Sequence, residues 1–484
     1  MPAHELSESS PLDQGSFNSS EHSDCGISEP TRRRLIITLI IILLAFEIGG
    51  QMIPGPMVRV IESIVCDRYW RAHGLTGHIP ERRCNIPAVQ TEVATVKGYS
   101  DLLEGLLCTI CAIPYGLLAD RYGRRRAIRL TVPGFLLNAL ITNSVLWFSD
   151  TFPLRAIWLA SFSWIIGGGP TVALVIIWTM LADLSTDSKR AMLFFHVGLA
   201  SQIAGFLASA ISSGLMALNP WIPLPIGCAT VTVGLGFALS LPETMSLVVK
   251  TRDATMCWDE NELVESIPNP PLRYIPLARK IERLIHPYLF IFNSRLLLLM
   301  LSFAVFQVAQ GSAAFLTQYI STRFSWTLVH AQLLTSLHAA ATIPVFAFLL
   351  PYFSEKVLYS LSLPRRDLHI ARFSIVSLTV GSLGTGLSSH ISLLVPSLCL
   401  HALGAGFALA IRSLVTSLVK REESARLYSA IEILQSMGSV LGSLCFTNAF
   451  KSGLLMDGIG SGLVWVLSSF LFAFVGTALM TIRV

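Results

Sequence analysis

Charged residues are scarce in this chain of 484 residues, where Asp, Glu, Lys and Arg together make up 13%. A typical soluble chain carries about 25%. Because a soluble protein of this size needs more charge to cover its surface, a cytosolic enzyme, a nucleic-acid binder and a disordered scaffold are all disfavoured. Apolar residues make up 52%, and the mean hydropathy is +0.62. This composition indicates a polytopic membrane protein.

Several chemical signatures are also missing. The chain has no phosphate-binding P-loop, no HExxH, no zinc signature and no Ser-His-Asp grouping, so we expect no ATP hydrolysis, no metal site, no cofactor and no enzymatic activity. Its nine cysteines are scattered, and the CxxC pair Cys108 and Cys111 lies in an apolar run, where packing is the better interpretation. The first apolar run is too long for a cleavable signal peptide.

The apolar residues form twelve runs, each near the length of about 20 residues that crosses a bilayer. They lie near 35–58, 98–119, 127–148, 154–182, 191–217, 221–242, 296–320, 328–352, 371–389, 391–416, 427–449 and 460–481. The sequence therefore predicts an all-α polytopic membrane protein with twelve transmembrane helices.

The longest internal polar stretch divides these helices into two groups of six. The predicted parts are a disordered cytosolic tail (1–32), an N-terminal half (33–242), a cytosolic central linker (243–295) and a C-terminal half (296–484). The fourth and fifth spans align without gaps onto the tenth and eleventh, so that Gly168 falls on Gly404. Pseudo-symmetric six-helix halves are typical of one transporter architecture.

The distribution of Lys and Arg predicts the orientation. With twelve spans both termini lie on one side, and most of the 35 Lys and Arg fall on that side, including the groups at 32–34 and 121–129. The positive-inside rule therefore predicts cytosolic termini. We expect a multi-pass protein, by default of the plasma membrane, although an internal membrane stays open.

A motif lies between the second and third predicted spans, where residues 116–126 read Gly-Leu-Leu-Ala-Asp-Arg-Tyr-Gly-Arg-Arg-Arg. It resembles the G-x-L-a-D-r-x-G-R-[KR] signature of the major facilitator superfamily. Gly116 would let helices approach closely, Gly123 permits a tight turn, and Asp120 at a helix end can pair with basic residues. The resemblance implies a cytosolic conformational latch made of Gly116, Asp120, Arg121, Gly123, Arg124 and Arg125.

Two further segments resemble fungal, ascomycete-type members of this superfamily. They are Leu241-Pro242-Glu243-Thr244 at the end of the sixth span and residues 319–326 after the seventh. The chain departs from the family at Gly167-Gly168-Gly169-Pro170, where many proton-driven members carry an arginine. The fifth span also lacks the G-P-x-x-G-G motif of drug/proton antiporters. The resemblance thus implies transport but leaves its direction open.

Ionisable residues within the predicted spans are functional candidates, because a charge in hydrocarbon is costly. Glu47 and Glu104 lie in the outer halves of the first and second spans. A desolvated carboxyl group holds its proton more tightly, so both are candidates for coupling to protons or substrate. Arg412 and Glu432 lie at matching depths of the tenth and eleventh spans, which predicts an ion pair with either a structural or a gating role.

The resemblance implies that the first, fourth, seventh and tenth spans line a central cavity. The cavity-lining candidates are Gln51, Trp164, Trp178, Gln307, Gln310 and His401. Amides and indoles suit a large amphipathic solute. His196, His338 and His401 are interpreted as packing residues or as pH-sensitive groups.

Residues 59–97 are predicted to form a long outer loop that contains Cys66 and Cys84. On an oxidising outer face these two cysteines can form a disulfide, worth about 3 kcal/mol in the chain-entropy model. The alternative is two free thiols.

The sequence as a whole predicts a monomeric secondary transporter that works by alternating access. Its partners would be a small organic solute, protons and the lipid bilayer, without nucleic acid. The leading hypothesis is proton-driven efflux of a metabolite or toxin. The alternatives are proton-coupled uptake of an organic nutrient and, from another class, a non-transporting membrane sensor on the same fold.

Overall fold

The computed structural model describes residues 29–241 and 293–482, apart from gaps at 76, 78, 185–186, 354–355, 357, 359–360, 420–423 and 457. All regular elements in this part of the chain are helices. The predicted linker at 243–295 lies almost entirely outside the described residues. The predicted tail extends too far, because α1 already begins at Glu29.

Each predicted span corresponds to a helix or a run of helices. In the N-terminal half these are α1 (Glu29–Met52), α2 (Pro54–Ala72), η1 (Glu81–Cys84), α3 (Pro87–Tyr122), α4 (Arg124–Trp147), η2 (Leu154–Ile157), α5 (Trp158–Ser161), η3 (Phe162–Ile165), α6 (Gly169–Leu184), α7 (Asp187–Leu218) and α8 (Pro223–Leu239). In the C-terminal half they are α11 (Ser294–Gln310), η5 (Gly311–Phe315), α12 (Leu316–Phe324), α13 (Leu328–Pro344), η6 (Val345–Leu349), α14 (Leu350–Tyr352), α15 (Leu363–Leu387), α16 (Ile391–Leu403), η8 (Gly404–Gly406), α17 (Phe407–Ser417), α18 (Ser424–Leu454), η9 (Gly458–Gly462) and α19 (Leu463–Thr481).

Nine helical stretches of the described chain are long and apolar enough to cross a membrane, and α8 is a shorter apolar helix. The helices α3 and α18, with 36 and 31 residues, take the places of the second and eleventh predicted spans. Helix α3 carries Lys97, Asp101 and Glu104 in its first half. Charged residues within a bundle normally face its interior rather than lipid, and α3 packs lengthwise against α18. The all-helical membrane fold is confirmed, whereas the count of twelve spans also requires α3, α8 and α18 to cross the membrane.

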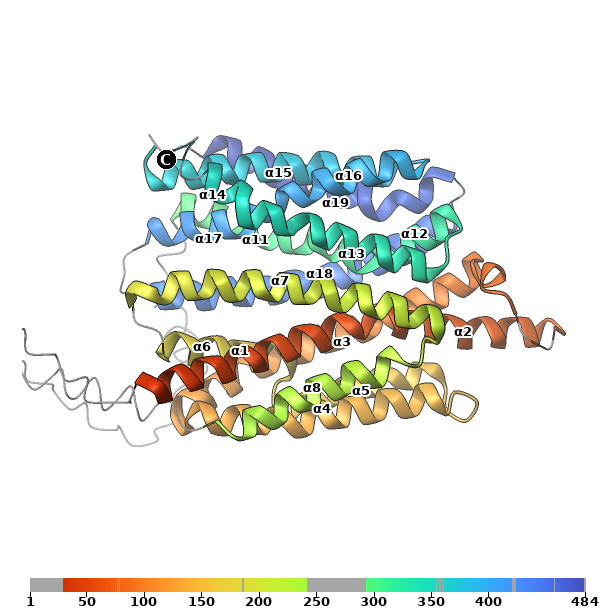
Figure 1. Ribbon diagram of the computed structural model, residues 1–484. Coiled ribbons are helices and arrows are strands. Elements are labelled where there is room, and N and C mark those ends of the chain that lie inside the picture. Colours follow the sequence, from red (N-terminus) through yellow and green to blue (C-terminus); the bar gives the residue numbers. More distant parts are fainter. Residues whose placement is uncertain are drawn as a thin grey trace, which may run out of the picture.

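The two groups of helices lie side by side (Figure 1). They meet where α3 packs against α18 and α7 packs against α13. The described chain begins and ends at the same end of the bundle, which we call the terminal end (Figure 1). The opposite end, formed by α2 and η1, is called the disulfide end.

The predicted outer loop at 59–97 is wrong, because most of it is helical. α2 continues beyond α1 and projects from the bundle (Figure 1). Pro54 and Pro56 lie in its first turn, where their missing N–H groups cost no helical hydrogen bond. Helix α3 begins at Pro87, so only the segment around η1 separates the two helices.

The predicted fourth span is interrupted between η3 and α6. Gly167, Gly168 and Gly169 have φ angles of +93°, +80° and +74°, a region that glycine adopts without steric cost. The Tyr115 hydroxyl fixes this break from α3, since it accepts a hydrogen bond from Gly167 N (2.7 Å) and donates one to Ile165 O (2.9 Å). The break brings Pro170 to the interior of the bundle.

Candidate functional site

Two cavities lie inside the bundle. The first, called the N-terminal cavity, has a volume of about 510 Å³ and is enclosed by α1–α6 and α8, with Glu47 and Trp164 on its wall. The second, called the interhalf cavity, has a volume of about 430 Å³ and lies between α3 and α6 on one side and α11 and α18 on the other. Both cavities include Asp101, Glu104 and Pro170 in their lining, so they share one wall. Volumes of this size suit small organic molecules.

Glu47 contributes a carboxyl group to the N-terminal cavity from α1. Its Oε1 accepts a hydrogen bond from Gln51 Nε2, one helical turn further along, at 3.1 Å. No described cation lies within ion-pair distance of it. The first predicted coupling candidate therefore lies on a cavity wall with one amide partner.

Glu104 lies on the shared wall of the two cavities. On the same helix, Lys97 Nζ forms an ion pair with Asp101 Oδ2 at 2.6 Å, and it lies 5.6 Å from the centre of the Phe315 ring. Glu104 has no ion-pair partner among the described residues. The wall thus presents a carboxyl group for which the protein supplies no described counter-ion.

An arginine contacts the α18 wall of the interhalf cavity. Arg412 Nη2 donates a hydrogen bond to Gln435 Oε1 at 3.1 Å, and Gln435 lines the cavity together with Gln307. The side chain of Glu432 lies outside the described residues, so the predicted ion pair between Arg412 and Glu432 stays a prediction.

The six cavity-lining candidates fall into two groups. Gln51 and Trp164 line the N-terminal cavity, and Gln307 lines the interhalf cavity. Trp178 packs against the apolar core of the N-terminal half, and neither Trp178 nor Gln310 is in the described lining of the two cavities.

His401 differs from the prediction because it is packed within the C-terminal half. It is 7% exposed, lies edge-on to Trp465 and does not belong to the described lining of either cavity. Its Nδ1 lies 3.3 Å from His338 Nε2. The α16 helix carries His401 on the face toward α13 and α19. There the imidazole ring packs against Trp465 and lies beside the ring of His338. His196, on α7, is exposed.

The motif at residues 116–126 lies at the terminal end of the bundle, where α3 ends and α4 begins. Gly123 forms the turn between these helices with φ +96°, and Arg124 Nη1 donates to Thr179 O at 2.9 Å. Arg125 Nε is buried without a hydrogen-bond partner in the described chain. No described atom lies within 4 Å of a Cβ placed at Gly116, so the close helix approach expected there is not present in this conformation. The side chains of Asp120 and Arg121 lie outside the described residues.

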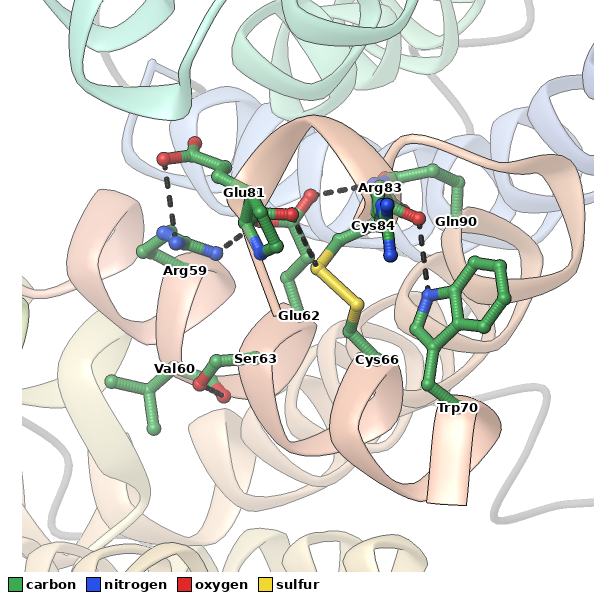
Figure 2. Close-up of a disulfide and its surroundings, with 11 residues drawn as sticks. Arg59, Val60, Glu62, Ser63, Cys66, Trp70, Glu81, Arg83, Cys84 and Gln90 are labelled. Atoms are coloured by element: carbon green, nitrogen blue, oxygen red, sulfur yellow. Dashed lines mark hydrogen bonds and ion pairs between the residues drawn. A yellow bond between two sulfur atoms is a disulfide. The ribbon is translucent and has the colours of Figure 1, made fainter. Parts of the chain in front are cut away.

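A disulfide joins α2 to η1 at the opposite end. Cys66 and Cys84 are bonded, with their Cα atoms 5.3 Å apart (Figure 2). Beside it, Arg59 forms ion pairs with Glu62 (2.8 Å) and Glu81 (3.3 Å). These contacts hold η1 against the projecting α2 helix.

Glu62 is a buried carboxylate that the sequence analysis missed. It is 1% exposed and lies between Arg59 and Gln90, whose Nε2 donates to Glu62 Oε1 at 2.6 Å (Figure 2). The spacing of Arg59 and Glu62 by three residues is a helical pairing signal that could have indicated it. Assigning the segment to a loop concealed that signal.

Gln90 also connects the two halves. Gln318 Nε2 of the C-terminal half donates to Gln90 Oε1 (2.8 Å) and Gln90 O (3.2 Å). We call the chain of contacts from Arg59 through Glu62 and Gln90 to Gln318 the amide bridge. Asn85 Nδ2 adds a bond to Ser321 O at 2.8 Å.

The other interhalf hydrogen bonds between described residues also come from the middle or from the disulfide end. They are Leu328 N to Glu81 Oε1 (2.8 Å), Ser209 Oγ with Ser336 Oγ (2.7 Å), Gln332 Nε2 to Ser209 Oγ (2.9 Å), Ser213 Oγ to Val329 O (2.9 Å) and Ser443 Oγ to Gly98 O (3.1 Å). The halves are therefore joined at the disulfide end in this conformation.

Comparison with known proteins identifies the family. The profile of the Major Facilitator Superfamily matches residues 94–443. The chain is 42% identical over 468 residues to the MFS-type transporter aprT of Aspergillus flavus, covering 96% of this chain and 91% of that protein. It is 30% identical to the MFS efflux pump atnC of Emericella nidulans, covering 91% and 86%.

Solved structures share the fold. The nucleoside transporter NupG superposes with a TM-score of 0.62 at 14% identity, covering 93% of this chain and 100% of that one. A D-xylose-proton symporter gives a TM-score of 0.63 at 13% identity, covering 94% and 98%. The family model and the relatives show that this chain belongs to the major facilitator superfamily and is a multi-pass secondary transporter of fungal type.

Proposed function

We propose that this protein exports an organic small molecule from the cytosol by alternating access, driven by the proton gradient across the plasma membrane. The observation that carries the coupling is the position of Glu47 and Glu104 on cavity walls, each without a described cationic partner. A carboxyl group in such a place can bind a proton from one side of the membrane and release it to the other. Relatives named as efflux pumps support the direction.

Two features support cytosolic termini and an outward disulfide end. The terminal end carries the basic groups Arg32–Arg34 and Arg124–Arg126, which the positive-inside rule assigns to the cytosol. The Cys66–Cys84 disulfide suits the oxidising outer face. With this orientation the interhalf hydrogen bonds close the outer side, as is required for loading a solute from the cytosol.

The test is solute-driven proton movement in proteoliposomes that contain a pH dye. A panel of amphipathic metabolites is applied against an imposed pH gradient, and the sign of the flux separates export from uptake. We expect Glu47→Gln to lower the coupled flux by at least about tenfold, because an amide cannot carry the proton. The variant keeps the shape of the side chain and a polar contact with Gln51.

Asp150→Asn is the matched control. Asp150 is an exposed acid whose ion pair with Arg71 (3.3 Å) lies away from both cavities, and such pairs contribute little. Its flux should equal that of the wild type. Solute movement without proton flux, unchanged in Glu47→Gln, would instead identify a facilitator in which Glu47 is a structural acid.

A further inference from the structure

Four nitrogen groups on the wall of the N-terminal cavity each donate a hydrogen bond to an oxygen acceptor within the protein. They are Lys97 Nζ to Asp101 Oδ2 (2.6 Å), Gln51 Nε2 to Glu47 Oε1 (3.1 Å), Asn138 Nδ2 to Ala160 O (2.9 Å) and Asn143 Nδ2 to Ala139 O (2.7 Å). The indole N–H of Trp164, another donor on this wall, lies near the Glu104 carboxyl group but outside hydrogen-bonding geometry with any described acceptor.

The acceptors on the same wall are largely uncommitted. The side-chain carbonyl oxygens of Asn138 and Asn143 accept no hydrogen bond from a described residue, and neither Glu47 nor Glu104 has a described cationic partner. The hydroxyl groups of Ser100 and Thr142 can serve as acceptors as well. An excess of acceptors favours a ligand that donates hydrogen bonds.

Charge leads to the same conclusion. The cavity wall carries three carboxyl groups and one ammonium group. Lys97 compensates Asp101, which leaves Glu47 and Glu104 without a cation from the described protein. An anionic solute would meet two groups of its own sign or would require both to be protonated. A cationic solute supplies the missing partner and offsets the cost of keeping the carboxylates out of water.

The third feature is an aromatic wall. Phe46, Phe135 and Trp164 all line the cavity and pack edge to face, with ring centroids 5.2 Å apart for Phe46 and Phe135 and 4.9 Å apart for Phe135 and Trp164. Aromatic faces attract cations and also bury apolar surface. Carboxyl groups beside aromatic rings form a combination that recognises organic ammonium groups.

We propose that the N-terminal cavity binds a protonated organic amine, with its ammonium group at the Glu47 and Glu104 carboxylates and its apolar part against Phe46, Phe135 and Trp164. This inference rests on the proposed function in one respect, namely that the cavity is part of the solute's route. It adds the chemical class of the solute, a primary or secondary amine that carries an aromatic or aliphatic body.

Binding of three probes with a common indole body tests the inference. Tritiated tryptamine is bound at neutral pH to the full-length protein in detergent without any ion gradient, and N-acetyltryptamine and indole-3-propionate compete as the neutral and anionic counterparts. We expect both competitors to bind at least about tenfold more weakly than tryptamine, a difference of about 1.4 kcal/mol. Equal affinity of tryptamine and N-acetyltryptamine, or no saturable tryptamine binding, would overturn the inference.

Two variants locate the ammonium group. Glu104→Gln and Glu47→Gln should each weaken tryptamine binding about tenfold and leave N-acetyltryptamine binding unchanged, so that the preference for the amine disappears. General damage to the fold would weaken the binding of both probes alike. If the more deeply placed Glu104→Gln fails to fold, Glu47→Gln still provides the test. If both variants still preferred tryptamine to N-acetyltryptamine, the amine would not bind in the N-terminal cavity.

The binding result is separable from the transport result. Amine binding that both variants weaken, without solute-driven proton flux, would support the inference and contradict the proposed coupling. Proton-coupled flux of N-acetyltryptamine at the same rate as tryptamine would support the proposed coupling and contradict the inference of an amine site. Asp150→Asn again serves as the control and should preserve the probe preference of the wild type.

Discussion

Gly167→Ala is expected to lower strongly both the yield and the melting temperature of the folded transporter. A Cβ atom at this position would lie 2.4 Å from Thr131 Cα and 2.5 Å from Leu130 O, both of which are backbone atoms of α4. The φ angle of +93° adds the cost of a left-handed conformation for an L-residue, about 1–2 kcal/mol. Overpacking adds about 1–3 kcal/mol. Together these effects are a large fraction of the stability of a typical protein.

The measurement is the monodisperse fraction and the melting temperature of a fluorescent fusion after extraction in detergent. Gly236→Ala is the matched control, because this glycine lies in α8 with open space around its Cβ position and an ordinary φ angle. The control should behave like the wild type. Equal melting temperatures for the two variants would show that the break in the fourth span is not rigid.

Tyr115→Phe tests the same break by a milder change. It removes the hydroxyl that accepts from Gly167 N and donates to Ile165 O. Loss of two hydrogen bonds with one backbone N–H left unpaired costs about 1–3 kcal/mol. We expect a lower melting temperature with retained folding, between the values for Gly167→Ala and Gly236→Ala. A melting temperature equal to that of the wild type would contradict a role for this hydroxyl.

The break at Gly167 shows where sequence reasoning reached its limit. The run of three glycines and Pro170 was recognised as a departure from the family, but an apolar run of sufficient length still predicted one continuous span. The length and hydropathy of an apolar run predict that it lies in lipid, but they carry no information on its φ angles. Only the contact of Gly167 with the α4 backbone and with Tyr115 shows why glycine is required there.

The prediction of a loop at residues 59–97 is wrong for the opposite reason. The charged residues of this segment, including Arg59 and Glu62, end the apolar pattern, and the end of that pattern predicts the end of the helix. A helix that leaves the membrane needs no apolar run, because water or a partner segment satisfies its polar face. The cysteines at 66 and 84 were nevertheless paired correctly, since that prediction needed only a shared segment on an oxidising side.

The candidate site was predicted in its acidic residues and in Trp164, and missed in its other aromatic residues. Glu47 and Glu104 were found because a carboxyl group inside a span is conspicuous against apolar neighbours. Phe46 and Phe135 are indistinguishable in sequence from residues that face lipid or the core. His401 was misplaced for a related reason, since the side of the helix on which a residue lies depends on packing with α13 and α19.

Gln318→Leu is expected to open the disulfide end of the transporter. The variant removes both hydrogen bonds from Gln318 to Gln90 and leaves Gln90 Oε1 buried without a partner, which costs about 1–3 kcal/mol in the closed conformation. The cost falls on that conformation alone, because the halves separate at this end when it opens. A change of 1.4 kcal/mol shifts the ratio of two conformations about tenfold.

The closed conformation is poised for such a shift. Gln318 Oε1 and Asn85 Oδ1 are already buried without a hydrogen-bond partner in the described chain. Each unpaired acceptor raises the free energy of the closed conformation and is relieved when water enters. We infer that the amide bridge holds the disulfide end closed with a small margin.

The measurement is the labelling rate of a reporter, Ser321→Cys, by a membrane-impermeant maleimide. Ser321 is 3% exposed and its backbone, rather than its side chain, accepts the bond from Asn85. We expect labelling about tenfold faster with Gln318→Leu, and faster again with Gln90→Leu, which also deprives Glu62 of its 2.6 Å bond.

Thr322→Val is the control on the same helix. The Thr322 hydroxyl donates only within α12, to the Gln318 and Tyr319 carbonyls, so its loss does not distinguish the open from the closed conformation. Its labelling rate should match that of the reporter alone. Replacing both glutamines by leucine should cost less than the sum of the two single changes, because no buried amide then lacks its partner. Equal labelling in Gln318→Leu and Thr322→Val would show that closure depends on the other interhalf contacts, such as those of α7 with α13 and of α3 with α18, and not on the amide bridge.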